Sequence, residues 1–259
     1  MKRVCLLVLL ILFSNVMAQK LEPIHSFELK ADTFLGYDSL GAWYTLSENI
    51  LTKTTKQGNW EFKLPQLGKI KHVDLQNPLK IIVFFQNFNT VVVLDNQLNL
   101  TQKIDLSDNR NPLLALGIGL ASGNRLWVYD GLSQKIGLYD YTKKDFQKLT
   151  TPLSNSMVYY ESDFNYFRWI DDQHQAFICD VYGKIQISGI VPENVQMLWA
   201  TDAIVFYKKD NDLYRYDFVG NKSTLIEIDK KTFKKFTYKD QILSIFTDHG
   251  ITNYKITIP

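Results

Sequence analysis

Aspartate recurs at one kind of position in this sequence, at the end of a short apolar run that precedes a turn. The residues are Asp38, Asp74, Asp171, Asp172, Asp202 and Asp240. A ring of carboxylates could hold a calcium ion or a cationic ligand if the fold brought them to one place. An aspartate before a turn also accepts hydrogen bonds from backbone N–H groups, and the position favours this structural role. We therefore expect turn formation, with a metal site as the alternative.

The residue patterns typical of catalytic sites are absent from the sequence. The four histidines are His25, His72, His174 and His249, and none falls in an HxxxH, HExxH or Cys/His pattern. Without a second ligand at a suitable spacing, a solvated or hydrogen-bonded role is expected for each. The GxSxG turn of serine hydrolases and the glycine-rich phosphate loops are also missing. The sequence thus predicts no catalytic, cofactor-binding or metal-binding residue.

Two segments are candidates for contact with a protein partner. The first is a basic cluster with interleaved aromatic residues, in which we single out Lys230, Lys231, Lys234 and Lys235. The second is an apparent insertion, Ser154–Phe164, which carries Tyr159 and Tyr160. For the lysines, the alternative is a solvated edge loop whose charges oppose the addition of a foreign strand.

The first 18 residues have the features of an export signal. Lys2 and Arg3 precede an apolar run of ten residues, and small residues allow cleavage after Ala18. The run is too short for a membrane-spanning helix, although an uncleaved anchor is the alternative reading. We expect a mature chain of residues 19–259 that is periplasmic, outer-membrane-associated or extracellular.

Removal of the signal changes both the charge and the cysteine content. The whole chain has 29 basic and 27 acidic residues, and loss of Lys2 and Arg3 brings the formal net charge to zero. A neutral chain offers no global attraction to nucleic acid or to an anionic membrane. Cys5 leaves with the signal, so Cys179 cannot form an intramolecular disulfide. We expect it to be a buried, inert thiol.

One unit is repeated along the chain. Residues 124–141 and 202–218 both read as a strand, a polar turn and a second strand ending in Tyr-Asp. Similar hairpins are predicted at 41–55, 79–95, 175–187 and 241–256. Aromatic residues assigned to comparable second-strand positions are expected to be core: Trp43, Trp127, Phe177, Phe206 and Phe246.

The repeat predicts an all-β fold, a β-propeller of six four-stranded blades. Each hairpin follows another short strand and most precede one, giving four strands at a spacing of about 40 residues. The last unit stops after its third strand, and residues 24–31 alternate like the strand that would complete it. Pairing of the two chain ends would close the ring and hide the edges of the first and last blades.

The unit around residues 175–187 departs from the repeat. Its first strand is assigned to YFRWID, which leaves Ser154–Phe164 as an insertion, and its fourth strand is missing or very short after Ile187. This irregularity leaves five or seven blades as alternatives, and a β-sandwich pair as the alternative architecture.

Three stretches carry a resemblance to a known family: residues 77–100, residues 119–141 and FRWID at 167–171. They resemble a family of exported β-propeller-like proteins of Bacteroidota, and a signal ending in Ala-Gln is similar to the export signals of that phylum. The resemblance runs through most of the mature chain. It implies a propeller fold and an accessory role in outer-membrane assemblies, including protein secretion machinery.

These observations predict a non-catalytic exported propeller that binds a protein partner in the cell envelope. It would act as a scaffold or as an accessory subunit of an outer-membrane secretion or assembly complex. We expect no cofactor, no nucleic-acid partner and no membrane-spanning segment in the mature chain. Two alternatives stay open: a metal-dependent hydrolase or lactonase with aspartates at the channel mouth, and a propeller that binds a small ligand or glycan.

Overall fold

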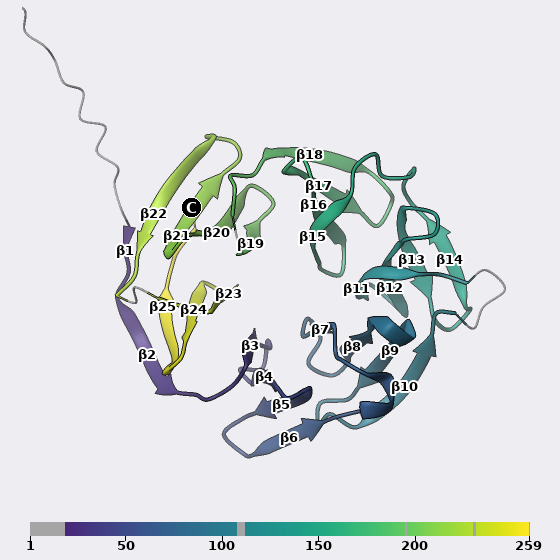
Figure 1. Cartoon of the computed structure of the whole chain (residues 1–259), viewed down its shortest axis with the longest axis horizontal. Helices are drawn as coiled ribbons and strands as arrows, with labels where there is room; N and C mark the ends of the chain where they lie inside the picture. Colours follow the sequence, from purple (N-terminus) through teal and green to yellow (C-terminus); the bar gives the residue numbers. More distant parts are fainter. Residues whose placement is uncertain (1–18, 108–111, 195, 230–231, 259) are drawn as a thin grey trace, which may run out of the picture.

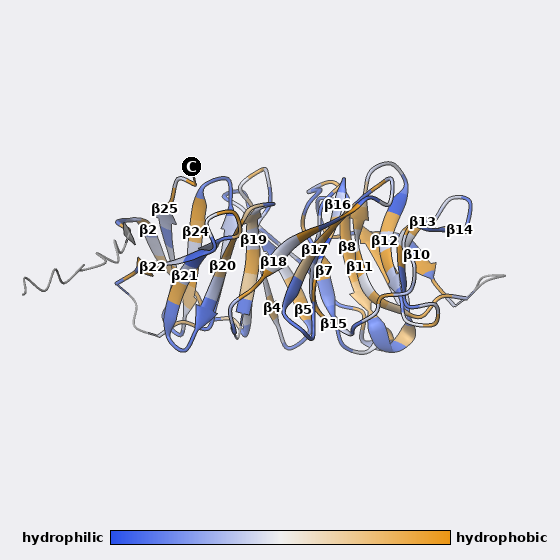
Figure 2. Ribbon diagram, turned by 90° about the horizontal axis from the view of Figure 1, so that it is seen from above, coloured by the Kyte–Doolittle hydropathy of each residue, from blue (hydrophilic) through white to orange (hydrophobic). Residues whose placement is uncertain are grey.

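The computed structural model describes residues 19–107, 112–194, 196–229 and 232–258. The fold consists of six sheets, each of four antiparallel strands, one of which gains a fifth, parallel strand. The sheets stand around a central axis, as Figure 1 shows. The prediction of a six-bladed β-propeller is therefore confirmed. Seen from the side in Figure 2, the ring is a disc whose turns gather at its two faces.

The first three blades follow one another in chain order. Blade one consists of β3 (Thr33–Tyr37), β4 (Trp43–Ser47), β5 (Ile50–Thr54) and β6 (Asn59–Phe62). Blade two consists of β7 (His72–Asp74), β8 (Ile81–Phe85), β9 (Thr90–Leu94) and β10 (Leu100–Asp105). Blade three consists of β11 (Ala115–Ala121), β12 (Arg125–Asp130), β13 (Lys135–Asp140) and β14 (Asp145–Lys148). Two single 3₁₀ turns are present: η1 (Pro65–Leu67) lies in the connection from blade one to blade two, and η2 (Gln86–Phe88) joins β8 to β9.

The last three blades include the chain ends. Blade four consists of β15 (Met157–Ser162), β16 (Tyr166–Asp171), β17 (Gln175–Asp180) and β18 (Ile185–Ile190). Blade five consists of β19 (Gln196–Thr201), β20 (Ile204–Lys209), β21 (Asp212–Asp217) and β22 (Lys222–Glu227), with β1 (Gln19–Lys20) outside them. Blade six consists of β23 (Lys235–Lys239), β24 (Ile242–Thr247), β25 (Gly250–Lys255) and β2 (Pro23–Glu28).

The apolar core lies between neighbouring blades rather than within one sheet. Tyr44 and Leu51 of blade one, for example, pack with Val83 and Val92 of blade two. The middle strands are covered on both faces, so β8 and β9 are buried along their whole length. This is why the first strand of each predicted hairpin reads as a continuous apolar run instead of an alternating one.

The N-terminal strand closes the ring, as the sequence predicts. β2 pairs antiparallel with β25 and supplies the outer strand that the last blade lacks. Ser26 Oγ also donates a hydrogen bond to Thr252 Oγ1 at 3.1 Å across this pair. The preceding strand β1 adds in parallel to β22, which the sequence does not predict, because two residues carry no periodicity.

Blade four corrects one expectation. The apparent insertion contains β15, the innermost strand, and YFRWID forms the second strand β16. The fourth strand is β18, six residues long, so the blade is regular. Phe177 accordingly lies in the third strand β17 and not in a second strand. The other four aromatic residues lie in second strands, as expected, and Trp43 is only partly buried.

The β2–β25 pair should depend on the absence of a side chain at Gly250. Its φ is +141°, and a Cβ there would lie 2.1 Å from the carbonyl oxygen of Phe27 and 2.8 Å from the backbone nitrogen of Leu29. We expect Gly250→Ala to destabilise the fold by about 3 kcal/mol or more, because backbone must move to relieve the clash. The measurement is the thermal unfolding midpoint.

Gly58→Ala is the matched control, since Gly58 has a φ of +154° but open space around it. It carries the backbone strain without the clash. Equal losses in the two variants would contradict the importance of the close approach at the ring closure.

Candidate functional site

The innermost strands of blades one, two, four and six line a pocket of about 400 Å³ at one mouth of the central channel. We call it the channel pocket. Its polar and aromatic lining includes Tyr37, His72, Asp74, Glu161, Thr237 and Lys239. Ionisable groups from four blades therefore meet in one cavity, and such convergence is typical of ligand-binding and active sites.

Glu161 is the carboxylate with the most unusual surroundings in this pocket. One of its oxygens accepts a hydrogen bond from the Tyr159 hydroxyl. The backbone N–H of Trp199 donates to both oxygens, with N···O distances of 3.2 and 3.3 Å. Burial raises the pKa of Glu161 to about 7, although the hydrogen bonds from Tyr159 and Trp199 and the charge of Arg168 oppose the rise. The carboxyl thus changes its charge near neutral pH.

Two basic groups near the axis are shifted toward their neutral forms. Burial lowers the pKa of His72, and the neighbouring carboxylate of Asp74 offsets this only in part. Burial also lowers the pKa of the Lys235 amine, on β23. The His72 ring lies 5.7 Å from the ring of Tyr160. A neutral imidazole and a carboxyl that titrates near pH 7 are suited to general acid–base chemistry.

The sequence-based reading missed Glu161. Its position on an inner strand follows only from the corrected order of strands in blade four. Its hydrogen-bond partner Trp199 lies 38 residues further along the chain, on blade five. A glutamate within an aromatic run, MVYYES, is the one signal that could have drawn attention to it.

Three of the aspartates, Asp38, Asp74 and Asp171, hold turns as expected. Asp38 Oδ1 accepts hydrogen bonds from the backbone N–H groups of Leu40 and Ala42, at 2.9 and 3.0 Å. Asp74 Oδ1 accepts from the N–H of Gln76, and Asp171 Oδ1 from the N–H of Gln173.

Some of the aspartates do not lie at the end of a first strand. Asp171 ends the second strand of blade four, and Asp172 follows it. Asp202 does follow a first strand, β19, but its carboxylate pairs with Arg168 at 2.7 Å. Within the described part of the chain, no three His, Cys, Asp or Glu residues are grouped so that they could hold a metal ion.

The predicted partner-contact residues are dispersed. Tyr159 and Tyr160 lie on the inner strand β15 instead of an outer insertion, and Tyr160 stacks on Phe167. Lys234 pairs with Asp248 at 2.5 Å, and Lys235 lies on the inner strand β23. Lys230 and Lys231 fall outside the described residues. A role for these residues in binding a partner stays a prediction.

The remaining candidate residues are Cys179 and three of the histidines. Cys179 is buried, and burial raises the pKa of its thiol to about 12, which agrees with an inert group. His25 lies in the closing strand β2, whereas His174 and His249 lie in turns.

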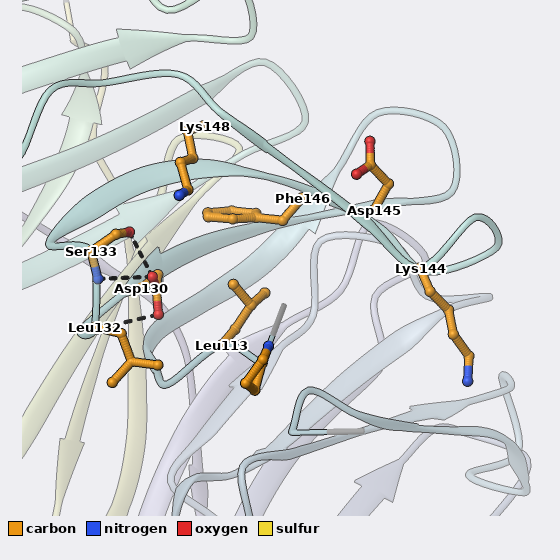
Figure 3. A pocket seen from close by; sticks show the side chains of 9 residues that line it. Leu113, Asp130, Leu132, Ser133, Lys144, Asp145, Phe146 and Lys148 are labelled. Carbon is orange, nitrogen blue, oxygen red and sulfur yellow. Dashed lines mark hydrogen bonds between the residues drawn. The ribbon is translucent and has the colours of Figure 1, made fainter. Parts of the chain in front are cut away.

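Figure 3 shows a second pocket, of about 540 Å³, beside blade three. The Asp130 carboxylate there accepts hydrogen bonds from the backbone N–H groups of Leu132 and Ser133 and from the Ser133 hydroxyl. The carboxylate therefore holds its own turn, and Phe146 covers part of the pocket.

An exposed apolar stripe runs along the outer strand of blade four. A β-bulge at Ser188 interrupts the pairing of β18 with β17, so Ile185, Ile187 and Ile190 stand opposite Cys179, Phe177 and Gln175. Paired residues share one face of a sheet, and these three partners alternate along β17. All three isoleucines therefore project from one face, with 42, 67 and 55% of their surfaces exposed. We call them the isoleucine stripe.

Comparison with known proteins identifies the fold. No family model and no curated protein matches the sequence. Virginiamycin B lyase from Staphylococcus aureus aligns over 86% of this chain and 79% of its own, with 14% identity and a TM-score of 0.58. YCF48 bound to D1 peptide aligns over 93% of this chain and 99% of its own, with 10% identity and a TM-score of 0.54.

A third similar structure is an extracellular domain. The extracellular domain of BT4673 from B. thetaiotaomicron is 13% identical, with a TM-score of 0.52, and covers 91% of this chain and 40% of that one. At these identities the likeness establishes the propeller fold. Among the described residues, no helix is long and apolar enough to cross a membrane.

Glu161 should make folding stability depend on pH. The folded carboxyl keeps its proton up to about pH 7, whereas the unfolded one loses it near its ordinary pKa of 4.5. Wild-type stability should therefore fall as the pH rises from about 4.5 to about 7. Glu161→Gln keeps the acceptor oxygen but cannot ionise. We expect it to raise the unfolding midpoint relative to wild type by about 2–6 °C more at pH 8 than at pH 5.

Thermal unfolding of both proteins at several pH values tests this expectation. Glu227→Gln is the control, because Glu227 is an exposed glutamate on an outer strand. A difference between wild type and Glu161→Gln that does not change with pH would contradict the raised pKa.

Proposed function

We propose that this protein is an exported propeller that binds a protein partner and serves as a non-catalytic scaffold or accessory subunit of a cell-envelope complex. An outer-membrane secretion or assembly complex is the setting that the sequence resemblance implies. The observation that carries the proposal is the isoleucine stripe, because three exposed isoleucines on one strand are costly in water unless something covers them.

The fold and the predicted export signal support this proposal. A ring with interblade cores is a rigid support, and its edges and turns are available for contacts. YCF48, which has the same fold, has been solved with the D1 peptide bound. The similar domain of BT4673 is extracellular. The residues before the first described strand have the composition of an export signal.

The channel pocket favours a second candidate function, the binding or hydrolysis of a small ligand. Glu161 and His72 line one cavity, in which burial raises the pKa of the carboxyl to about 7 and lowers the pKa of the imidazole, so that the ring favours its neutral form. Virginiamycin B lyase, an enzyme by its name, has the same fold. A hydrolase of this kind would place its ligand against Glu161, whereas a scaffold would leave this pocket unused.

Purification of the tagged protein from its native envelope in a gentle detergent tests the proposal. We expect a partner protein at a fixed stoichiometry, together with no bound divalent ion. Glu161→Gln should retain the same partner, because the isoleucine stripe lies on the outer edge and Glu161 on the inner strand. Protein that emerges alone with one divalent ion per chain would contradict the scaffold and favour the hydrolase.

A further inference from the structure

The outer edges of the blades are protected in two ways, and blade four lacks both. The chain covers its own edge in blade six, where β2 lies outside β25, and the end of the edge in blade five, where β1 pairs with Ile226 and Glu227 of β22. The outer strands of blades one, two and three carry charged residues, such as Glu61, Lys103 and Asp145. Charges on an edge strand discourage the addition of a foreign strand.

β18 has no such protection. Its sequence, IQISGI, contains no charged residue, and no described strand pairs with its outer edge. Its backbone therefore offers unpaired groups beside three exposed isoleucines. The combination of an open edge and an apolar stripe is typical of sites that bind an extended peptide by strand addition.

We infer that β18 is the docking strand for the partner, which adds an extended, uncharged segment with apolar residues at every second position. This inference rests on the proposed function and specifies the surface used. The isoleucine stripe selects apolar side chains on one face of the added strand. Gln186 lies on the opposite face, where it accommodates uncharged polar residues. A charged residue in the added strand would meet no opposite charge on β18.

A second copy of this chain fits the edge poorly. Two identical strands that pair around a two-fold axis bring the same residues to the centre. The bulge at Ser188 lies in the middle of β18, and the carbonyl oxygen of Gly189 already accepts a hydrogen bond from Gln175 Nε2 at 3.1 Å. Each copy would present its interruption to the other, whereas a foreign strand can bend past it.

The test is site-specific photo-crosslinking in the native envelope. A benzophenone amino acid replaces Ile187 in the full-length protein, and Gln102 on the outer strand β10 is the control position. We expect Ile187 to crosslink to one stretch of one protein, with apolar residues at alternate positions and no charge. Gln102 should not crosslink there. Crosslinking to a charged stretch, to lipid or to a second copy of this chain would overturn the inference, as would equal capture at Gln102.

Substitutions separate this inference from the proposed function. Ile187 is 67% exposed, so Ile187→Lys should leave the unfolding midpoint unchanged. It should reduce the co-purified partner at least tenfold, whereas Ile187→Val and Gln102→Lys should retain it. If wild type brings down a partner and Ile187→Lys brings down as much, the scaffold function stands and the docking strand is wrong. If wild type brings down none, the scaffold function itself fails.

Discussion

The pairing of β2 with β25 is the interaction on which the rest of the molecule depends. The blades pack face to face, and each buries its apolar side chains against the next. Every blade in such a ring is fully packed against its neighbours only if the last blade has all four of its strands. Residues 23–28 complete it from the other end of the chain, more than 220 residues away in sequence. The closing strand thus converts a row of sheets into one cooperative unit.

Closure also determines where polar chemistry and binding can occur. Because the space between blades is filled with apolar side chains, the ionisable groups of the inner strands meet at the axis. At the axis, Glu161 and His72 are partly withdrawn from water, and their pKa values shift in opposite directions for the same reason. At the periphery, the N-terminal segment covers the outer edge of blade six and the end of the edge of blade five, and β18 is the uncharged edge without a cover among the described blades. The two candidate functions therefore lie at the inner and the outer edge of the ring.

Much of the fold could be predicted from the sequence, because the spacing of hairpins and the unmatched strand at each chain end are local patterns. Blade four was assigned one strand out of step because β15 lines the channel. Its sequence mixes Glu161 and Ser162 with aromatic residues and looks less like a strand than the apolar β16. The turn role of Asp38 and Asp74 followed from position alone. The raised pKa of Glu161 could not be predicted, since it arises from burial that only the assembled ring provides. The continuity of the isoleucine stripe depends on a β-bulge that the composition does not reveal.

Hydrogen–deuterium exchange of the purified protein tests the central claim most directly, that the ring closes the outer edge of its last blade and leaves β18 open. Amides of β25 should exchange slowly, because this strand is paired on both sides. Amides of β18 that face outward should exchange orders of magnitude faster. Protection of the whole of β18 to the level of β25 would show that its edge is already covered, and would contradict the account.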